Sequence, residues 1–173
     1  MEKDINIEKA AEVLTPNQMR TLAAIADRIF PKTDTPGAVE IGVLNYIAIA
    51  LAGDYAALAP LYRQGLCAVN RLAQSKFAKR FPDLNEEQKD AVLTEFEAGS
   101  VPGFKKAAEF FETVRYHVLE GVFCEPQYGG NKGMIGWRLV GFPGQQFGYD
   151  DAHINTRVTL EPVAVEYPKV DKK

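Results

Sequence analysis

The chain has 173 residues, of which 46% are hydrophobic and 25% are charged, and its formal net charge is −3. A chain of this length can bury one hydrophobic core but is short for two independent domains. Its 20 basic and 23 acidic residues form no block of like charges, which argues against a nucleic-acid-binding or membrane-surface protein. We therefore expect one domain, residues 14–149, between an N-terminal extension, residues 1–13, and an extended C-terminal tail, residues 150–173.

No stretch of the sequence approaches the roughly 18 consecutive apolar residues that a membrane-spanning helix needs. Gly42 and Asn45 interrupt even the apolar run from Ile41 to Ala52. Residues 1–12 carry charges of both signs, without the apolar stretch of a signal peptide and without a twin-arginine motif. We expect a protein that is not integral to the membrane.

Signals for helix starts and ends are clear in the first part of the chain. Thr15 as N-cap, Pro16 at the first helical position and Gln18 three residues after the cap form a capping-box pattern, and Pro31 ends this helix. A second helix is predicted over residues 38–52. Because it is apolar on all sides, we expect it at the centre of the core.

Three further helices are predicted before the composition changes. The apolar spacing over residues 55–81 is that of a long amphipathic helix, in which Pro60 and Gly65 are weak points. Asn85 is expected to cap the next helix, and the last long helix is predicted over residues 104–123. The sequence thus predicts a mainly α fold, a single-domain bundle of about five helices.

After Cys124, glycine and aromatic residues dominate the sequence. Seven of the fourteen glycines fall between Gly129 and Gly148, interleaved with five aromatic residues: Tyr128, Trp137, Phe142, Phe147 and Tyr149. Disordered segments are poor in aromatic residues, so we expect an ordered, irregular segment over residues 125–149, without helix. Glycines allow close backbone approach and aromatics supply contact area, which favours a partner-binding surface. Capping of the domain's own core is the second interpretation, and the two are compatible.

The tail that follows contains four apolar residues in near alternation: Val158, Leu160, Val163 and Val165. This pattern indicates an extended segment that pairs as a short strand or lies along another surface.

The two cysteines, Cys67 and Cys124, stand inside helical patterns with apolar neighbours. This setting favours buried free thiols, since cysteine is among the most often buried residue types. A disulfide within the chain or to another subunit is the main alternative. Neither cysteine has a second cysteine or a histidine close to it in the sequence, so metal ligation is not expected.

Only two histidines, His117 and His153, are available as catalytic bases. His117 stands in a hydrophobic helical pattern, so we interpret it as a packed histidine, with a functional pocket around it as the alternative. His153 lies in a polar run and is interpreted as a surface or interface residue. His117 and Glu120 are three positions apart, but a di-metal site in a helical bundle needs two Glu-x-x-His units, and none is present.

The glycine run GGNKGMIG, Gly129 to Gly136, does not match a nucleotide-binding loop. It contains neither G-x-G-x-x-G nor G-x-x-x-x-G-K-[ST], and it follows a predicted helix where both motifs require a strand. C-x-x-C-H for covalent haem and a cysteine cluster for iron and sulfur are also missing. We therefore expect no catalytic residue, metal or cofactor in this chain.

The segment Phe123 to Gly144, FCEPQYGGNKGMIGWRLVGFPG, resembles the signature of the gluconate 2-dehydrogenase subunit 3 family. The shared features are an acidic residue and proline before Tyr-Gly-Gly-Asn, a Gly-Trp pair, and Gly-aromatic-Pro-Gly. The segment Thr33 to Ile47, TDTPGAVEIGVLNYI, is similar to that family's Thr-Pro-Gly-Ala element, and Leu14-Thr15 matches its usual helix start. The likeness covers residues 14–144.

The resemblance implies a non-catalytic small subunit that accompanies a large FAD-dependent dehydrogenase of the glucose-methanol-choline type, often alongside a multi-haem cytochrome c subunit. The large subunit would oxidise a sugar, a glycoside or a sugar acid, and this chain would assist its folding, stability or export. The residues that match the motif are the candidate partner interface: Tyr128, Gly129, Gly130, Asn131, Gly136, Trp137, Gly141, Pro143 and Gly144.

The resemblance also bears on location and leaves alternatives open. Family members commonly carry a twin-arginine leader, so the expected location is periplasmic if such a leader was removed or belongs to a partner, and cytoplasmic otherwise. A chaperone that leaves after flavin insertion is a variant of the same role. The alternative from a different class is a stand-alone helical enzyme or small-ligand-binding protein with a pocket near His117.

Overall fold

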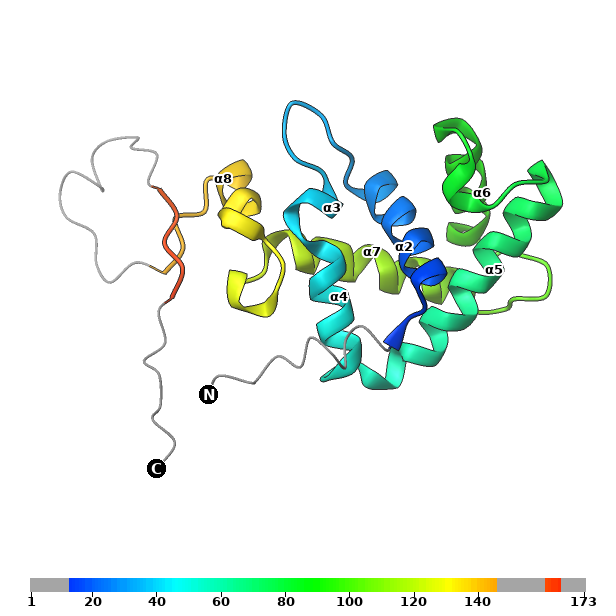
Figure 1. Cartoon of the computed structure of the whole chain (residues 1–173), viewed down its shortest axis with the longest axis horizontal. Helices are drawn as coiled ribbons and strands as arrows, with labels where there is room; N and C mark the ends of the chain where they lie inside the picture. The colour runs from blue at the N-terminus through cyan, green and yellow to red at the C-terminus, as the bar shows by residue number, and fades with distance from the viewer. Residues whose placement is uncertain (1–12, 146–160, 166–173) are drawn as a thin grey trace.

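The computed structural model describes residues 13–145 and 161–165 and shows the predicted mainly α fold (Figure 1). The first described helix, α2 (Pro16–Ile29), starts at Thr15 as the capping box requires. The Gln18 amide donates to Thr15 Oγ1 at 3.3 Å, and the Thr15 amide donates to Gln18 Oε1 at 2.9 Å. Two of the amides left free at a helix start are thereby satisfied, and this prediction is confirmed.

The predicted helix over residues 38–52 is instead two helices, α3 (Ala38–Ile41) and α4 (Val43–Ala52). The break lies at Gly42, whose φ of +93° is in the left-handed region that glycine adopts without a steric penalty. A Cβ at Gly42 would also lie 3.3 Å from the carbonyl oxygen of Gly129. The prediction of one continuous helix was wrong because the left-handed conformation of Gly42 interrupts the helix where a distant segment approaches it.

The predicted helix over residues 55–81 is shorter than expected. A 3-10 turn, η1 (Ala56–Leu58), precedes α5 (Ala59–Phe77), and Pro60 lies in the first turn of α5, where proline is tolerated. The helix ends because Ala78 takes the left-handed conformation, with φ of +54°. The following residues form a second 3-10 turn, η2 (Phe81–Asp83).

The two remaining long helices are α6 (Glu86–Glu97), with the predicted cap at Asn85, and α7 (Ala107–Phe123). Gly65 of α5 lets α7 approach closely, since a Cβ at Gly65 would lie 2.2 Å from Cδ2 of Phe110. The Phe110 ring meets three other rings at centroid distances of 5.8 to 6.4 Å, those of Tyr62, Phe96 and Phe104. These rings form the core where α5, α6 and α7 meet.

In Figure 1, α7 runs through the middle of the molecule, with α5 and α6 at one end and the short helix α8 (Ile135–Val140) at the other. Helix α7 contacts α2, α3, α4, α5, α6 and α8. Within the described residues, no single helix is long and apolar enough to cross a membrane. Helix α4 and the helical segment Ala56–Phe77 pass that test only as a pair, and the chain bends by 98° between them.

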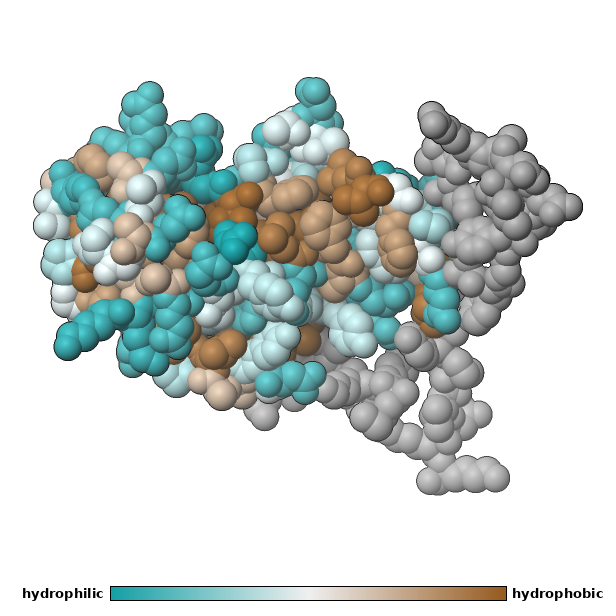
Figure 2. All heavy atoms as spheres, turned by 180° about the vertical axis from the view of Figure 1, so that it is seen from behind, coloured by the Kyte–Doolittle hydropathy of each residue, from teal (hydrophilic) through white to brown (hydrophobic). Residues whose placement is uncertain are grey.

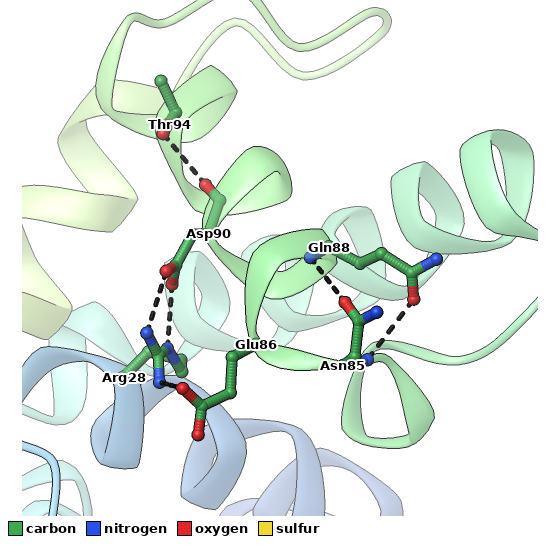
Figure 3. Close-up of polar contacts among 6 residues, drawn as sticks. All are labelled: Arg28, Asn85, Glu86, Gln88, Asp90 and Thr94. Atoms are coloured by element: carbon green, nitrogen blue, oxygen red, sulfur yellow. Dashed lines mark hydrogen bonds and ion pairs between the residues drawn. The ribbon is translucent and has the colours of Figure 1, made fainter.

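One arginine joins α2 to α6. The Nε and Nη2 atoms of Arg28 donate to the two carboxylate oxygens of Asp90, each at 2.8 Å, and its Nη1 atom lies 2.8 Å from a carboxylate oxygen of Glu86 (Figure 3). Only 21% of the Arg28 side chain is exposed, and its contact with Asp90 is bidentate. Such a contact stabilises the fold more than an ordinary exposed ion pair does. It fixes the start of α6 against the end of α2.

Candidate functional site

The glycine- and aromatic-rich segment folds directly onto the C-terminal end of α7. The described part of this segment, residues 125–145, is called the glycine block. It contains two 3-10 turns, η3 (Pro126–Tyr128) and η4 (Lys132–Met134), and then α8. The prediction that helix does not resume after Cys124 was wrong, because α8 forms within the segment.

Asn131 is the central residue of the glycine block. It is fully buried and has a φ of +45°, a conformation that asparagine tolerates better than most residues. Its Nδ2 donates to the carbonyl oxygen of Cys124 at 2.9 Å, and its Oδ1 accepts from the amide of Gly136 at 2.8 Å. Its own amide donates to the carbonyl oxygen of Gly121 at 2.8 Å. One side chain thus joins the end of α7 to the start of α8.

Two glycines of the block let its backbone touch the backbone of α7. A Cβ at Gly130 would lie 2.2 Å from the carbonyl oxygen of Gly121, and a Cβ at Gly136 would lie 2.0 Å from that of Val122. Both distances are far below van der Waals contact, and backbone atoms cannot swing away as a flexible side chain can. These two positions therefore require glycine for close approach.

Trp137 completes the attachment. Its side chain is 4% exposed, and its Nε1 donates to the carbonyl oxygen of Phe123 at 2.7 Å. The last carbonyls of a helix have no partner within the helix, and here the oxygens of Gly121, Phe123 and Cys124 all accept from Asn131 or Trp137. The glycine block is thus the C-terminal cap of α7.

The block also contacts the start of α4. Asn45 donates from Nδ2 to the carbonyl oxygen of Gly129 at 3.0 Å, and a Cβ at Gly129 would lie 2.6 Å from Asn45 Nδ2 and from Ile49 Cδ1. The segments 33–47 and 123–144, which carry the family resemblance, therefore meet in the structure.

A short segment of the tail, residues 161–165, is hydrogen-bonded to the glycine block. Gly144 forms a parallel bridge with Val163, and the Val163 amide donates to the carbonyl oxygen of Pro143 at 3.1 Å. The Val165 amide donates to the carboxylate of Glu125 at 2.8 Å. Within the described residues, the predicted tail pairing is present as this one bridge. The other predicted tail positions, Val158 and Leu160, lie outside the described residues, as do Phe147, Gly148, Tyr149 and His153.

A family model described as Gluconate 2-dehydrogenase subunit 3 matches residues 16–144. The chain belongs to this family. The match runs from the first residue of α2 to the residue that is bridged to Val163, so it includes the helical body and nearly all of the glycine block. No significant match was found among curated proteins or among solved structures. Membership makes this chain a subunit of a dehydrogenase complex.

The nine signature residues of this family member differ in burial. Five are buried and hold the block to its own chain: Gly130, Asn131, Gly136, Trp137 and Gly144. Gly129 and Pro143 are half-buried, while Gly141 is exposed and Tyr128 is 54% exposed. The buried five have an internal role that composition did not reveal. The interface role of all nine stays a prediction.

Sequence reasoning missed other exposed apolar residues beside the block. Leu139 and Val140 of α8 are 41% and 61% exposed, and Tyr116 of α7 is 61% exposed. For Tyr116, a signal exists in the sequence of α7. Its apolar residues extend beyond the stripe that a core-facing helix needs, because Tyr116, Leu119 and Phe123 form a second stripe on another side.

His117 of the subunit is packed, as predicted. Its ring is 3% exposed, stacks on Tyr55 at a centroid distance of 4.6 Å, and places Nδ1 2.9 Å from the hydroxyl oxygen of Tyr62. Burial lowers the pKa of His117, which favours the neutral ring, and burial raises the pKa of Tyr62. Next to this pair, the Glu120 carboxylate accepts from the hydroxyls of Tyr46 at 2.8 Å and Tyr55 at 3.2 Å.

The two cysteines differ in their surroundings. Both are free, as expected, but Cys67 is exposed, so the prediction that it is buried was wrong. It lies on the outward side of α5, at a surface cavity of about 400 Å³ that is also lined by Arg20, Asn70 and Arg80, away from His117. Cys124 is half-buried, and burial raises the pKa of its thiol to about 11.

Proposed function

We propose that this protein is the non-catalytic accessory subunit of an FAD-dependent dehydrogenase of the glucose-methanol-choline type, which oxidises a sugar, a glycoside or a sugar acid. The observation that carries the proposal is the family match over residues 16–144, which includes the residues that attach the glycine block to α7. In this role the chain binds the large flavoprotein subunit and assists its folding, stability or export. A cytochrome c subunit is a third component where the complex passes electrons to haem.

The glycine block supports the assignment of FAD to the partner subunit. A phosphate-binding loop uses its glycines to bring backbone amides up to the ligand. Here the space beside Gly130 and Gly136 is filled by the backbone of α7, so these glycines do not fit a dinucleotide. We therefore assign the flavin, and the oxidation chemistry that it supplies, to the large subunit.

The competing function, a ligand pocket at His117, is not favoured by the geometry. Ligand pockets present polar groups to a cavity. The His117 ring is instead stacked on Tyr55 and hydrogen-bonded to Tyr62. His117 is accounted for by packing between α5 and α7.

Co-expression tests the proposed function. The large flavoprotein subunit is produced with this full chain, without it, and with the variant Asn131→Ala, in which the attachment of the block is broken. We expect the yield of soluble, flavin-loaded dehydrogenase, measured by flavin absorbance and by reduction of an artificial electron acceptor, to fall several-fold without the chain and to fall with the variant. Equal yield of active flavoprotein in the presence and absence of the chain would refute an assisting role.

A further inference from the structure

The exposed large apolar side chains of this protein are concentrated in the C-terminal part of the described chain. Nine large hydrophobic residues are exposed in the described part of the chain, and eight of them follow position 115: Tyr116, Leu119, Phe123, Tyr128, Leu139, Val140, Phe142 and Val163. The ninth, Val39, lies on α3, which contacts η4 of the glycine block. Helices α2, α5 and α6 contribute none to this set. A one-sided distribution of this kind marks an interaction surface.

The α7 part of this surface is a stripe along one side of the helix. Tyr116, Leu119 and Phe123 are spaced by three and four positions, which places them on the side opposite the buried Val114 and Val118. The Phe30 ring extends the stripe, since its edge meets the Phe123 ring at a centroid distance of 6.5 Å. Seen from behind, with α7 towards the viewer, Figure 2 shows a band of apolar residues across the middle of the molecule.

The α8 part is held in a fixed position beside the stripe. Trp137 donates to the Phe123 carbonyl, so the side chain that anchors α8 is bonded to the last residue of the stripe. Leu139 and Val140 follow directly on the exposed side of α8. This bond restrains α8 relative to the end of α7, and a surface that is ordered before binding has a lower entropic cost of association.

Two carboxylates near the stripe, those of Glu112 and Glu120, already have partners. Both carboxylate oxygens of Glu120 accept tyrosine hydroxyls, and Glu112 accepts from Arg115 Nη2 at 2.7 Å. Removing water from the stripe thus leaves no oxygen of Glu120 without a partner. The centres of protein interfaces are depleted in free charges and enriched in Tyr and Phe, and this stripe has the same character.

We propose that the surface formed by Tyr116, Leu119, Phe123, Leu139 and Val140, here called the α7–α8 face, is the docking site for the large flavoprotein subunit. The proposal rests on the accessory-subunit function. Because this family consists of subunits of a dehydrogenase complex, a different chain must cover part of the molecule. The α7–α8 face offers an apolar surface with two exposed aromatic side chains, Tyr116 and Phe123. Its occupant is an apolar surface of the large subunit with a complementary shape.

The test measures the binding of purified, flavin-loaded large subunit to the full chain and to two double variants. The first, Tyr116→Ala with Leu119→Ala, removes two side chains of the α7–α8 face. The control, Gln64→Ala with Gln74→Ala, removes two exposed side chains of α5 at the other end of the molecule. Alanine favours helix, so both variants keep their helices, and circular dichroism with thermal unfolding checks that they fold.

We expect the first variant to bind about 30-fold more weakly or worse, the size of loss typical of two interface anchors, and the control to bind within about twofold of the original chain. If the unmodified chain fails to bind the large subunit, the accessory-subunit function itself is refuted. If the unmodified chain and both variants bind equally well, the function stands and the α7–α8 face is not the docking site. A homodimer of this chain that the first variant dissociates, with large-subunit binding unchanged, would also overturn the proposal.

Discussion

The Oδ1 atom of Asn131 accepts a hydrogen bond of 2.8 Å from the backbone amide of Gly136, and this bond joins the start of α8 to the residue that caps α7. The asparagine is fully buried, so a missing partner cannot be replaced by water without opening the block. The glycine block and the end of α7 therefore form one unit. A substitution at Asn131 or at Gly136 is therefore expected to destabilise both the glycine block and the end of α7.

Replacing Asn131 tests this unit. Asn131→Gly keeps the left-handed backbone and removes the side-chain bonds to Cys124 and Gly136, so we expect the free energy of unfolding to fall by about 2–3 kcal/mol. Asn131→Ala loses the same bonds and is also strained at φ of +45°, so it should lose about 1 kcal/mol more. Urea unfolding followed by circular dichroism measures both. Variants as stable as the original chain would show that the two bonds contribute little.

Gly136→Ala separates close packing from helix propensity. Gly136 lies inside α8, where alanine is favoured over glycine by about 1 kcal/mol in an unrestrained helix. The added Cβ would meet the Val122 carbonyl oxygen, so we instead expect a loss of about 2 kcal/mol or more. Gly133→Ala is the control, because Gly133 has a φ of +64° but open space around it, and it should lose only about 1 kcal/mol. A stabilised Gly136→Ala variant would contradict the described contact between α8 and α7.

Gly144→Ala is expected to release the tail segment without unfolding the helices. A Cβ at Gly144 would lie 2.0 Å from the Val163 carbonyl oxygen, so the bridge cannot form as it stands. Amide hydrogen exchange at Val163 and Val165 should become faster, while the amides of α7 keep their protection. Gly141→Ala has a similar backbone, with φ of +67°, and no neighbouring atom to meet, so it is the matched control. Equal exchange at Val163 in the two variants would argue against the bridge.

His117 gives the protein a pH-dependent stability. Burial lowers the pKa of this histidine in the folded state below its ordinary value of 6.5, so the unfolded chain binds the proton more readily. The stabilisation is fully present above pH 6.5 and is lost as the pH falls from there to the lowered pKa. We expect urea unfolding to show this fall as the pH is lowered below about 6.5 in the original chain but not in His117→Phe.

The control for this prediction is His153→Gln, which keeps His117 and should keep the fall. His117→Phe also leaves the Tyr62 hydroxyl without its present partner, so its stability should be lower at every pH. The comparison therefore concerns the slope with pH. If the free energy of unfolding of His117→Phe depends on pH as steeply as that of the original chain, the effect belongs to other titratable groups.

Local signals in the sequence predicted the helix starts well. The capping boxes at Thr15 and Asn85 involve residues three positions apart, so the chain encodes them without reference to the rest of the fold. Gly42 is different. Its left-handed turn separates α3 from α4 because the block, more than eighty positions later, lies against it, as the bond from Asn45 to Gly129 shows. A pattern read along one helix carries no sign of that contact.

Long-range contacts were also missing from the prediction of the candidate site. Composition indicated that the glycines and aromatics of the block make close contacts, and they do, but it did not indicate with which surface. Gly130, Asn131, Gly136 and Trp137 contact the end of α7, which sequence reasoning treated as a finished helix. Tyr116 and Leu119, by contrast, lie in the helix predicted over residues 104–123, and that prediction did not specify which side of the helix is exposed. Their exposure depends on which side of α7 the other helices cover.

The accessory-subunit role is tested most directly by co-expressing this full chain with the large flavoprotein subunit and measuring the mass and flavin content of the purified product by size-exclusion chromatography with light scattering. We predict one species that contains both chains, has a mass well above the 19.1 kDa of this chain, and carries flavin absorbance and dehydrogenase activity in the same peak. Two separate species, with this chain alone at 19.1 kDa and full activity in the other peak, would contradict the role.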